Sequence, residues 1–468
     1  MKKGKEIELT VEKFADRGKS LARIDGFVVF IPQAVPGDKV RVRIRRKKKN
    51  FAEAALLEVI EPSELRTSPR CEYFGTCGGC KWQHVDYEAQ LEAKRQSVKD
   101  ALEHTGGFSG IDVPATYGAE DIFRYRNKME YSFSASRWLT TEEIASGKSF
   151  NTAFALGMHV PGRFDRVIDL HSCFLPASVS MDIVNGMRAL ALEEGWSCWS
   201  TSTRSGFLRH LVVRTGARTG EVMVNLVTNG FDEERFEKIK QYLKDSFPAI
   251  TTFVNTSNTG VAQVAIGEKE YIGFGDGVIH DEIGGFRFEI APSAFFQTNT
   301  KQAEKLYEFV REFSEPRSDD LLYDLYCGAG TISLFMAPHV KHVVGIELVP
   351  EAVKNAYANA SANNVQNCTF AQGDMKNLFD AEFVARHGRP DVFIVDPPRA
   401  GMHEKVVKEI ADLKPERFVY VSCNPQTQAR DIKLLADLYH VEQIQPVDLF
   451  PHTTHIENVI KMRLRSDV

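Results

Sequence analysis

Cys423 is the residue whose type and position most directly suggest chemistry. It lies within VSCNP (421–425), at the end of an apolar run, and follows both a glycine-rich loop and the segment DPPR (396–399). A thiol at the carboxyl end of a strand, above a cofactor crevice, is placed where an α/β sheet presents reactive groups. A strand-end cysteine alone is more often a packing residue, so the hypothesis of covalent catalysis depends on its neighbours.

The glycine-rich loop before Cys423 predicts a nucleotide site. The run DLYCGAGT (324–331) joins a predicted strand to a predicted helix, and its two glycines let the backbone approach a ligand. Glu347 ends the next strand, where a carboxylate can accept both hydroxyls of a ribose, and Asp374 follows the third strand, where it could hold the adenine edge. The missing third glycine and the absence of a phosphate-binding lysine favour S-adenosylmethionine over NAD or ATP.

Three further cysteines form a compact group with metal-ligand spacing. Cys71, Cys77 and Cys80 are separated by glycine-containing turns that let their sulfurs converge. Eight cysteines at irregular spacings in a chain of this size indicate metal ligands, catalytic thiols or core residues before disulfides. Three thiols need a fourth ligand, and four thiolates suit either zinc or an iron–sulfur cluster.

The N-terminal elements form a module of their own. Residues 7–60 show short alternating apolar runs broken by DRG (16–18), DG (25–26) and PGD (36–38), which predicts a small antiparallel barrel. Residues 1–50 hold 15 lysines and arginines against 6 acidic residues, a net charge of +9 in a chain whose total is -5. A basic module on an acidic chain suggests an appendage that contacts phosphates, with a solvated turn as the simpler alternative.

Two further regions follow the barrel. Residues 87–104 are predicted to form an amphipathic helix that could pack on the C-terminal domain, and residues 123–288 to be strand-rich. After residue 291, strands and helices alternate in the pattern of a doubly wound sheet, with strands expected at 321–326, 343–346, 392–395 and 418–421. The expected fold class is therefore a multidomain α/β protein: an OB-like barrel (1–62), a central α+β region (63–288) and a C-terminal Rossmann-like domain (289–468).

Length and composition set outer limits on the class of protein. With 468 residues, 43% of them apolar, the chain can bury a large core and form several domains. No stretch approaches the roughly 18 apolar residues of a spanning helix, and the N-terminus lacks the apolar core of a signal peptide. We therefore expect a cytoplasmic protein with no membrane partner, and no obligate protein partner is evident.

Two resemblances make these expectations specific. The barrel, with its PGD turn followed by a basic alternating strand, resembles the TRAM domain, which is attached to RNA-modifying enzymes. DPPRAG (396–401), SCNP (422–425) and HIE (455–457), in this order, resemble the RNA uracil-C5 methyltransferase family, and the match runs over most of the chain. The resemblance implies that the C-terminal domain is a class I methyltransferase, with Cys423 as nucleophile and Glu457 as proton acceptor. It places four residues around the methyl donor and the uracil: Gln297, Tyr326, Glu347 and Asp396. Thr331, a further cofactor contact, stands where many members have asparagine.

The chemistry of this family explains why such residues are needed. Uracil C5 is a poor nucleophile, and attack of a thiolate on C6 places enolate density on C5, which can then take a methyl group. A carboxylate such as Glu457 must afterwards remove the C5 proton so that the thiolate can leave. Asp396 is expected to accept a hydrogen bond from the uracil N3 proton, and helix amides after Pro425 are expected to favour the thiolate of Cys423.

The resemblance also indicates the metal and the RNA. It adds Cys173 as the fourth ligand and points to a [4Fe-4S] cluster in the central region. The barrel and the long middle region are similar to the members that act on ribosomal RNA, which implies a uridine of 23S rRNA as substrate. The alternatives are a tRNA uridine C5-methyltransferase, a tRNA methylthiotransferase, and a non-catalytic RNA-binding assembly factor.

Overall fold

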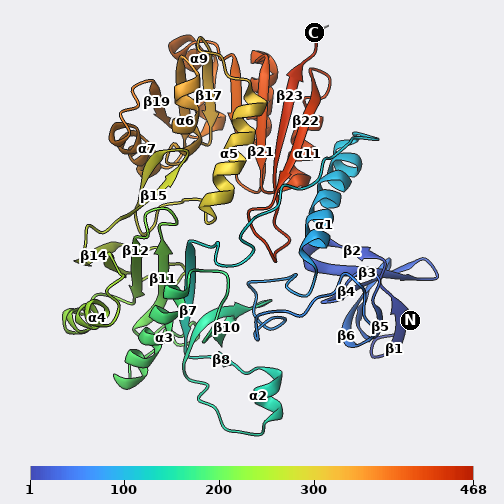
Figure 1. The fold of residues 1–468 in the computed structure, drawn as a ribbon, viewed down its shortest axis with the longest axis vertical. Coiled ribbons are helices and arrows are strands. Elements are labelled where there is room, and N and C mark those ends of the chain that lie inside the picture. The colour runs from blue at the N-terminus through green and yellow to red at the C-terminus, as the bar shows by residue number, and fades with distance from the viewer. Residues whose placement is uncertain (1, 467–468) are drawn as a thin grey trace.

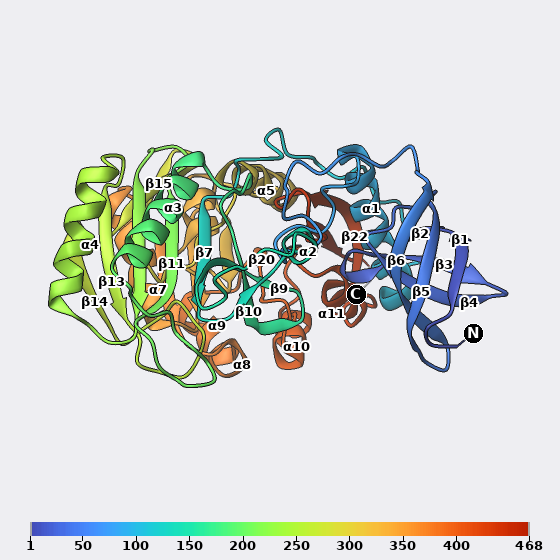
Figure 2. The same cartoon turned by 90° about the horizontal axis from the view of Figure 1, so that it is seen from below.

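The structure is a computed structural model that describes residues 2–466, and its elements gather into three sheets and a hairpin. The C-terminal sheet and the central sheet lie one above the other along the long axis, and the N-terminal barrel lies to the side (Figure 1). The view from below also places the barrel at one edge of the molecule (Figure 2). Within residues 2–466, no helix has the length and apolar character needed to cross a membrane.

The N-terminal barrel is a rolled six-stranded sheet in the order β1-β5-β6-β4-β3-β2. Val40, Val42 and Ile44 alternate with outward-facing residues and form part of its core. The turn Asp25–Gly26 has positive φ at both positions, 50° and 79°, which suits a right-twisted hairpin. The predicted antiparallel barrel is confirmed except for one pair, because β4 and β6 run parallel. The strands are β1 (Glu6–Thr10), β2 (Lys13–Phe14), β3 (Lys19–Ile24), β4 (Phe27–Pro32), β5 (Lys39–Lys47) and β6 (Phe51–Glu61).

The central sheet has eight strands in the order β14-β13-β12-β11-β7-β9-β10-β8. Helices α3 (Ser178–Glu193) and α4 (Glu233–Ser246) pack on one face, where Met129, Tyr131 and Phe133 of β7 join the core. The alternating residues of β7 point to the other face. The strands are β7 (Lys128–Ser134), β8 (Arg137–Trp138), β9 (Ala155–Val160), β10 (Arg163–Asp169), β11 (Leu208–Thr215), β12 (Val222–Thr228), β13 (Thr252–Ser257) and β14 (Lys269–Phe274), with the short helix α2 (Thr141–Ala145) after β8.

The C-terminal sheet has seven strands in the order β19-β18-β17-β20-β21-β23-β22. The five strands from β19 to β21 are parallel, and β23 runs antiparallel to both β21 and β22. The parallel strands read as continuous apolar runs because helices cover both faces. The strands are β17 (Leu321–Leu325), β18 (His342–Glu347), β19 (Cys368–Gln372), β20 (Val392–Val395), β21 (Arg417–Ser422), β22 (Tyr439–Val447) and β23 (Glu457–Leu464).

Two separate cores lie on the two faces of this sheet. One contains residues of α5, α6 and α7, and the other contains residues of α8 to α11. The helices are α5 (Thr300–Ser314), α6 (Thr331–Met336), α7 (Pro350–Ala362), α8 (Met375–Leu378), α9 (Ala381–His387), α10 (Glu404–Leu413) and α11 (Pro425–Lys433).

Two segments from earlier in the chain complete these cores. Helix α1 (Tyr87–Asp100) continues as a π-helical turn over Ala101–Gly106, and its end packs in the second core. The hairpin of β15 (Ile279–Ile283) and β16 (Phe286–Ile290) packs in the first core. Because it packs in this core, the hairpin is part of the C-terminal domain. The sequence alone places almost all of its residues in the middle region (63–288).

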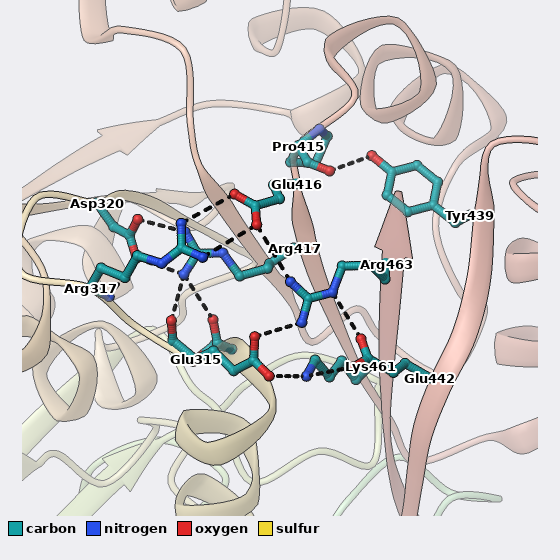
Figure 3. Close-up of polar contacts among 11 residues, drawn as sticks. Glu315, Arg317, Asp320, Pro415, Glu416, Arg417, Tyr439, Glu442, Lys461 and Arg463 are labelled. Atoms are coloured by element: carbon teal, nitrogen blue, oxygen red, sulfur yellow. Dashed lines mark hydrogen bonds and ion pairs between the residues drawn. The ribbon is translucent and has the colours of Figure 1, made fainter. Parts of the chain in front are cut away.

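A buried ion pair fixes the amino end of β21 to the segment between α5 and β17. Arg417 is fully buried, and its guanidinium donates two hydrogen bonds to the Asp320 carboxylate, at 2.6 and 2.9 Å. Arg417 also donates to the carbonyl oxygen of Glu315 at 2.5 Å, while the Glu315 carboxylate pairs with Lys461 and Arg463 of β23 (Figure 3). This network lies at the edge of the sheet opposite the carboxyl ends of the parallel strands, so its role is to hold the fold.

Replacing Asp320 with asparagine is expected to lower the free energy of unfolding by about 3–5 kcal/mol, because the buried Arg417 charge would lose its anionic partner. Urea unfolding followed by circular dichroism measures this change. Glu416→Gln is the matched control: the Glu416 side chain is half exposed and pairs with Arg317 at 3.4 Å and with Arg463 at 3.5 Å, so a change below about 1 kcal/mol is expected. Equal effects of the two variants would contradict this account.

Candidate active site

The candidate site lies at the carboxyl edge of the C-terminal sheet, where the strand order changes direction. After β17 the chain proceeds outward through β18 and β19, and β20 then returns on the other side of β17. Ligands bind at such switch points because neighbouring loops leave in opposite directions and open a crevice. The segments that follow β17, β20 and β21 bring Tyr326, Asp396 and Cys423 to this edge, and Glu347 ends β18 there.

The loop between β17 and α6 has the backbone geometry of a nucleotide site. Tyr326, Gly328 and Gly330 have positive φ values of 69°, 55° and 78°, so the chain turns sharply before α6. A Cβ atom at Gly328 would meet nothing within 4 Å, whereas one at Gly330 would lie 3.1 Å from atoms of Ala356 and Phe370. Gly328 therefore leaves room beside the loop, and Gly330 lets the helix pack closely on the sheet.

Glu347 is held against this loop by two backbone amides. The N–H groups of Gly328 and Val349 donate to its two carboxylate oxygens, at 3.1 and 2.8 Å. Each oxygen keeps a second acceptor position, so the carboxylate can still bind hydroxyl groups of a ligand. Asp374, after β19, caps α8 and pairs with Lys376 at 2.9 Å, and the hydrogen bond from Lys376 lowers the pKa of Asp374.

The floor of the site contains two further polar residues. Thr331 begins α6, and its hydroxyl lies 2.9 Å from the buried hydroxyl of Tyr307 in α5. Burial raises the pKa of Asp324 to about 7. One of its carboxylate oxygens accepts a hydrogen bond from the Ser333 hydroxyl at 2.6 Å, and the other has no hydrogen-bond partner among the described residues. Sequence reasoning missed Tyr307, because an aromatic residue on an amphipathic helix looks like any other core residue.

Gln297, a predicted contact of the methyl donor, lies in the segment before α5. Its main-chain oxygen accepts a hydrogen bond from the Asn127 side chain at 2.9 Å, so the central region fixes this segment. Phe295, two residues earlier, is 76% exposed, which is unusual for a phenylalanine. Sequence reasoning also missed Phe295, since its exposure could not be read from the local pattern.

Cys423, Asp396 and Glu457 come together at the carboxyl edge, although they derive from three separate loops and strands. Glu457 is the first residue of β23 and is buried, with 6% of its surface exposed. Burial, reinforced by the neighbouring Asp396, raises the pKa of Glu457 well above its usual value. Burial also raises the pKa of Asp396 to about 7, with a smaller contribution from Asp324.

The environment of Cys423 favours the thiol in the free protein. Burial raises its pKa to about 11, and the Glu457 and Asp396 carboxylates add to the rise, while Arg399 opposes it by charge and hydrogen bonding. The expectation that helix amides after Pro425 would favour a thiolate is therefore wrong for the unliganded site. Two neighbouring carboxylates and partial desolvation outweigh one helix terminus and one guanidinium.

Arg399 links Cys423 to the loop between β22 and β23. Its guanidinium lies 3.3 Å from Nδ1 of His455, and burial together with the Arg399 charge lowers the pKa of His455 to about 4. His455 is therefore neutral at pH 7. Sequence reasoning included Arg399 and His455 in motifs without assigning them this contact.

The loop of residues 448–456 is held in place by α1 and by the segment after Cys80. The Lys94 ammonium and the Tyr87 hydroxyl donate to the Asp448 carboxylate at 2.6 and 2.9 Å. The backbone amides of Lys81 and Trp82 donate to the carbonyl oxygen of His452 at 2.8 and 3.0 Å. Glu457 follows this loop directly, so α1 and the cysteine-containing segment help to position this edge of the sheet.

The four predicted ligand cysteines lie near one another, but a metal site is not confirmed. Burial raises the pKa of Cys77 to about 11 and that of Cys80 to about 12, and Cys173 and Cys71 add to both rises. Amide groups of Gly79 and Gln83 donate to the sulfurs of Cys77 and Cys80, at 3.4 and 3.2 Å. Across residues 2–466, no group of three or more histidine, cysteine, aspartate or glutamate side chains is arranged so that it could hold a metal ion.

Two protein-family models match this chain, one at each end. A tRNA (uracil-5-)-methyltransferase family model matches residues 219–464, and a TRAM domain model matches residues 1–57. A protein of Bacteroides thetaiotaomicron, described as an uncharacterized RNA methyltransferase, is 42% identical over 96% of this chain and all of its own length. A Staphylococcus aureus protein with the same description is 36% identical over 99% of this chain and 98% of its own.

A solved structure is similar over nearly the whole chain. It is the Pyrococcus abyssi tRNA (uracil-54, C5)-methyltransferase in complex with S-adenosyl-L-homocysteine, which is 29% identical and superposes with a TM-score of 0.77. The similarity covers 97% of this chain and 100% of that one. Because the family model spans more than half of the chain and the relatives match its whole length, this chain belongs to the tRNA (uracil-5-)-methyltransferase family and is an RNA uracil-C5 methyltransferase.

Proposed function

We propose that this protein transfers a methyl group from S-adenosylmethionine to C5 of a uridine in RNA, with Cys423 as nucleophile and Glu457 as proton acceptor. The observation that carries the proposal is the grouping of Cys423, Asp396 and Glu457 at one edge of the sheet, beside the nucleotide loop. A thiol, a proton acceptor and a donor-binding loop have to meet at one base, because uracil C5 does not attack a methyl donor unaided.

In each proposed step, the bond that forms is matched by a bond that breaks. Attack of the Cys423 thiolate on C6 forms a sulfur–carbon bond and moves the electrons of the C5–C6 double bond into an enolate. C5 then forms a bond to the methyl group as the methyl–sulfonium bond breaks. Glu457 removes the C5 proton, and the electrons of the C–H bond restore the double bond and expel the thiolate. Asp396 would accept a hydrogen bond from the N3–H group of uracil, a donor that cytosine lacks.

The residues around the nucleotide loop fit the methyl donor. Glu347 would accept the ribose hydroxyls, Asp374 would contact the adenine edge, and Gln297, Tyr326 and Thr331 would surround the rest of the molecule. The Pyrococcus abyssi relative, solved with S-adenosyl-L-homocysteine, supports this choice of ligand. When bound, the donor supplies the methyl group and a positive charge on sulfur.

The charges of the site are consistent with a cationic ligand. Asp324 and Asp396 have pKa values raised to about 7, Glu457 is raised well above its usual value, and Cys423 is raised to about 11. A neighbouring positive charge favours the ionised form of each group. We therefore expect Cys423 and Glu457 to take their reactive, deprotonated forms in the donor complex rather than in the free protein.

For the RNA there are two candidates: a uridine of 23S rRNA, which the sequence alone implied, and a uridine of tRNA. The 23S rRNA candidate depends on the N-terminal barrel, because tRNA-specific members of the family are expected to lack such a barrel. The Pyrococcus abyssi tRNA enzyme nevertheless matches 97% of this chain, which leaves too few residues unmatched for it to lack a barrel of about 60 residues. The barrel therefore does not distinguish the two RNAs, and the similarity to that enzyme favours tRNA.

Mapping of the methylated position tests the proposal. Purified protein is incubated with labelled S-adenosylmethionine and with rRNA or tRNA from cells that lack the gene, and 5-methyluridine is located by mass spectrometry. One methylated uridine in 23S rRNA supports the first candidate, and one in tRNA supports the second. A methylthio group, a methyl group on another atom, or no transfer to either RNA would overturn the proposal.

We propose further that Cys71, Cys77, Cys80 and Cys173 bind a [4Fe-4S] cluster. Cys71 and Cys77 pack against the same small buried cluster, and the amide donors to Cys77 and Cys80 are of the kind that stabilise thiolate ligands. In such a cluster each cysteine binds a different iron, so its sulfurs lie farther apart than the ligands of a single ion.

Anaerobically purified protein is expected to contain about four iron and four sulfide per chain. Cys80→Ser should lose most of both, because one of four ligands is removed. Cys198→Ser, at a buried cysteine of the central core, is the matched control and should retain them. Zinc without sulfide, or full iron content in Cys80→Ser, would contradict the cluster.

A further inference from the structure

A buried hydroxyl group lies beside the end of the nucleotide loop. Tyr307 is 2% exposed and lies on the buried stripe of α5. The neighbouring positions of this stripe are apolar: Ala303, Leu306 and Val310. The Tyr307 ring meets that of Phe335 in α6 edge to face, with centroids 5.8 Å apart. A phenylalanine would pack in the same way, so packing does not account for the hydroxyl.

The Tyr307 hydroxyl has one hydrogen-bond partner within residues 2–466, the Thr331 hydroxyl at 2.9 Å. Burial raises the pKa of Tyr307, and three nearby carboxylates add to the rise: Asp396, Asp324 and Glu457. The phenol therefore keeps its proton at pH 7, and a buried O–H group without an acceptor is unfavourable. Tyr307 is accordingly the donor of this pair, and Thr331 is the acceptor.

The Thr331 hydroxyl then has its own proton left to donate. Its side chain forms no second hydrogen bond within the described part of the chain. Thr331 is the first residue of α6 and is half-buried, so its hydroxyl can be reached from the loop side. Accepting from Tyr307 occupies one lone pair of the Thr331 oxygen and turns its proton away from α5. The pair therefore presents one directed donor to a ligand in the loop.

The position of the pair indicates which part of the methyl donor it faces. Gly328, earlier in the loop, contacts Glu347, the residue proposed to bind the ribose. Thr331 lies three residues further and is joined to Tyr307, which is close enough to Asp396 for that charge to act on it. In S-adenosylmethionine, the amino-acid part extends from the ribose through the sulfonium, which has to face the reacting residues. Its carboxylate is the strongest acceptor in that part.

We propose that Tyr307 is a positioning residue for the methyl donor: it donates to Thr331, so that the Thr331 hydroxyl donates to the carboxylate of the donor's amino-acid part. This inference rests on the proposed function, since it takes S-adenosylmethionine as the ligand. An asparagine at this position, as in many members of the family, carries N–H donors in a fixed plane. A threonine has a single rotatable proton, and Tyr307 directs it.

Two nucleosides that differ in the amino-acid part test this inference. S-adenosylhomocysteine keeps the carboxylate, and 5′-methylthioadenosine lacks the whole amino-acid part. Binding of each to the full-length protein is measured by isothermal titration calorimetry, without RNA. The variants are Tyr307→Phe, Thr331→Val, Thr331→Ser and the double variant Tyr307→Phe/Thr331→Val. The double variant removes both hydroxyls, so it leaves no buried phenol unpaired and keeps the test available if Thr331→Val does not fold.

Tyr323→Phe is the matched control. Tyr323 is also a fully buried tyrosine of this domain, but it packs in the core on the other face of the sheet. Its hydroxyl donates to the carbonyl oxygen of Gly388 at 2.6 Å. The substitution is chemically the same, so it reports what the loss of a buried phenol hydroxyl does to the fold alone.

Thr331→Val is expected to weaken binding of S-adenosylhomocysteine about tenfold or more, the effect of losing a hydrogen bond to a charged group. Tyr307→Phe should weaken it about fivefold, because the Thr331 hydroxyl remains but its proton is no longer directed. Both should bind 5′-methylthioadenosine within about twofold of wild type. The double variant should lose no more than Thr331→Val, since the two residues act on one contact. Thr331→Ser and Tyr323→Phe should bind both nucleosides like the wild type.

The kinetics of methyl transfer give a second readout. Tyr307→Phe should raise KM for S-adenosylmethionine by about fivefold and change kcat by less than about twofold, because a contact to the carboxylate is made equally before and during the reaction. Tyr323→Phe should change neither constant.

Equal weakening of both nucleosides by Tyr307→Phe would indicate a general packing role and would overturn the inference, as would wild-type affinity of Tyr307→Phe for S-adenosylhomocysteine. Failure of the proposed function gives different results. If the wild type binds neither nucleoside, the donor assignment and this inference both fail. If it binds S-adenosylhomocysteine but methylates no RNA, the proposed function fails, and the binding comparison still decides the role of Tyr307.

Discussion

Cys423→Ala is expected to lower methyl transfer at least about 10⁴-fold and to remove any covalent protein–RNA adduct. Without a sulfur–C6 bond, C5 of uracil keeps its low nucleophilicity, and neither the donor site nor Glu457 can replace that step. Single-turnover transfer of labelled methyl groups measures the first effect. Denaturing gels, on which a covalent complex with RNA migrates above the free protein, measure the second.

Cys327→Ala is the matched control for this variant. Cys327 is the rival thiol at the same edge of the sheet, but it is buried in the cofactor loop, and burial raises its pKa well above the usual value. We expect Cys327→Ala to keep the adduct and to lose only a few-fold in rate through packing. An adduct formed by Cys423→Ala, or one lost in a folded Cys327→Ala protein, would contradict the assignment.

The pH dependence of Cys423 in the free protein gives a second readout. With a pKa raised to about 11, only about one thiol in 10⁴ is ionised at pH 7. Since the thiolate is the reactive form, alkylation of Cys423 by iodoacetamide should be slow at pH 7 and rise about tenfold per pH unit toward pH 11. S-adenosylmethionine should accelerate alkylation at pH 7, and neutral S-adenosylhomocysteine should not. A fast, pH-independent rate in the free protein would contradict this prediction.

The C-terminal fold could be predicted from the sequence because its signals are local. A parallel strand covered on both faces is a continuous apolar run, as at residues 392–395 and 418–421, and each run coincides with the observed strand to within one residue at either end. The position of Cys423 and Asp396 at the carboxyl edge then follows from the topology. Once the strands were known, little freedom remained in where their last residues could lie.

The contacts that hold the site together could not be predicted, because they join segments far apart in the chain. Tyr307 reaches Thr331 across 24 residues, and Lys94 reaches Asp448 across 354. No local pattern records such pairs. The protonation state of Cys423 cannot be predicted from a local pattern for the same reason: it depends on how deeply the thiol is buried and on which carboxylates the fold brings beside it.

Glu457→Gln is expected to stop the reaction after methyl transfer, so that a methylated RNA remains covalently attached to Cys423. The amide cannot accept the C5 proton, and loss of a general base slows proton removal by about 10²–10⁴-fold. Addition to C6 and methylation of C5 do not require that proton to leave. The expected result is a burst of about one methyl group per protein chain, which stays with the protein on a denaturing gel and is released slowly as 5-methyluridine.

The burst distinguishes the loss of the general base from general damage to the active site. Glu404→Gln, at an exposed carboxylate in the first turn of α10, should turn over like the wild type without an accumulated adduct. The double variant Cys423→Ala/Glu457→Gln should give neither burst nor adduct, since the adduct needs the thiol. In the wild type, release of the adduct should slow as pH falls, because the raised pKa of Glu457 means that acid converts the carboxylate into a form that cannot accept a proton. Multiple turnovers at the wild-type rate by Glu457→Gln would show that another group removes the C5 proton, and an adduct without a methyl group would mean that Glu457 acts before methyl transfer.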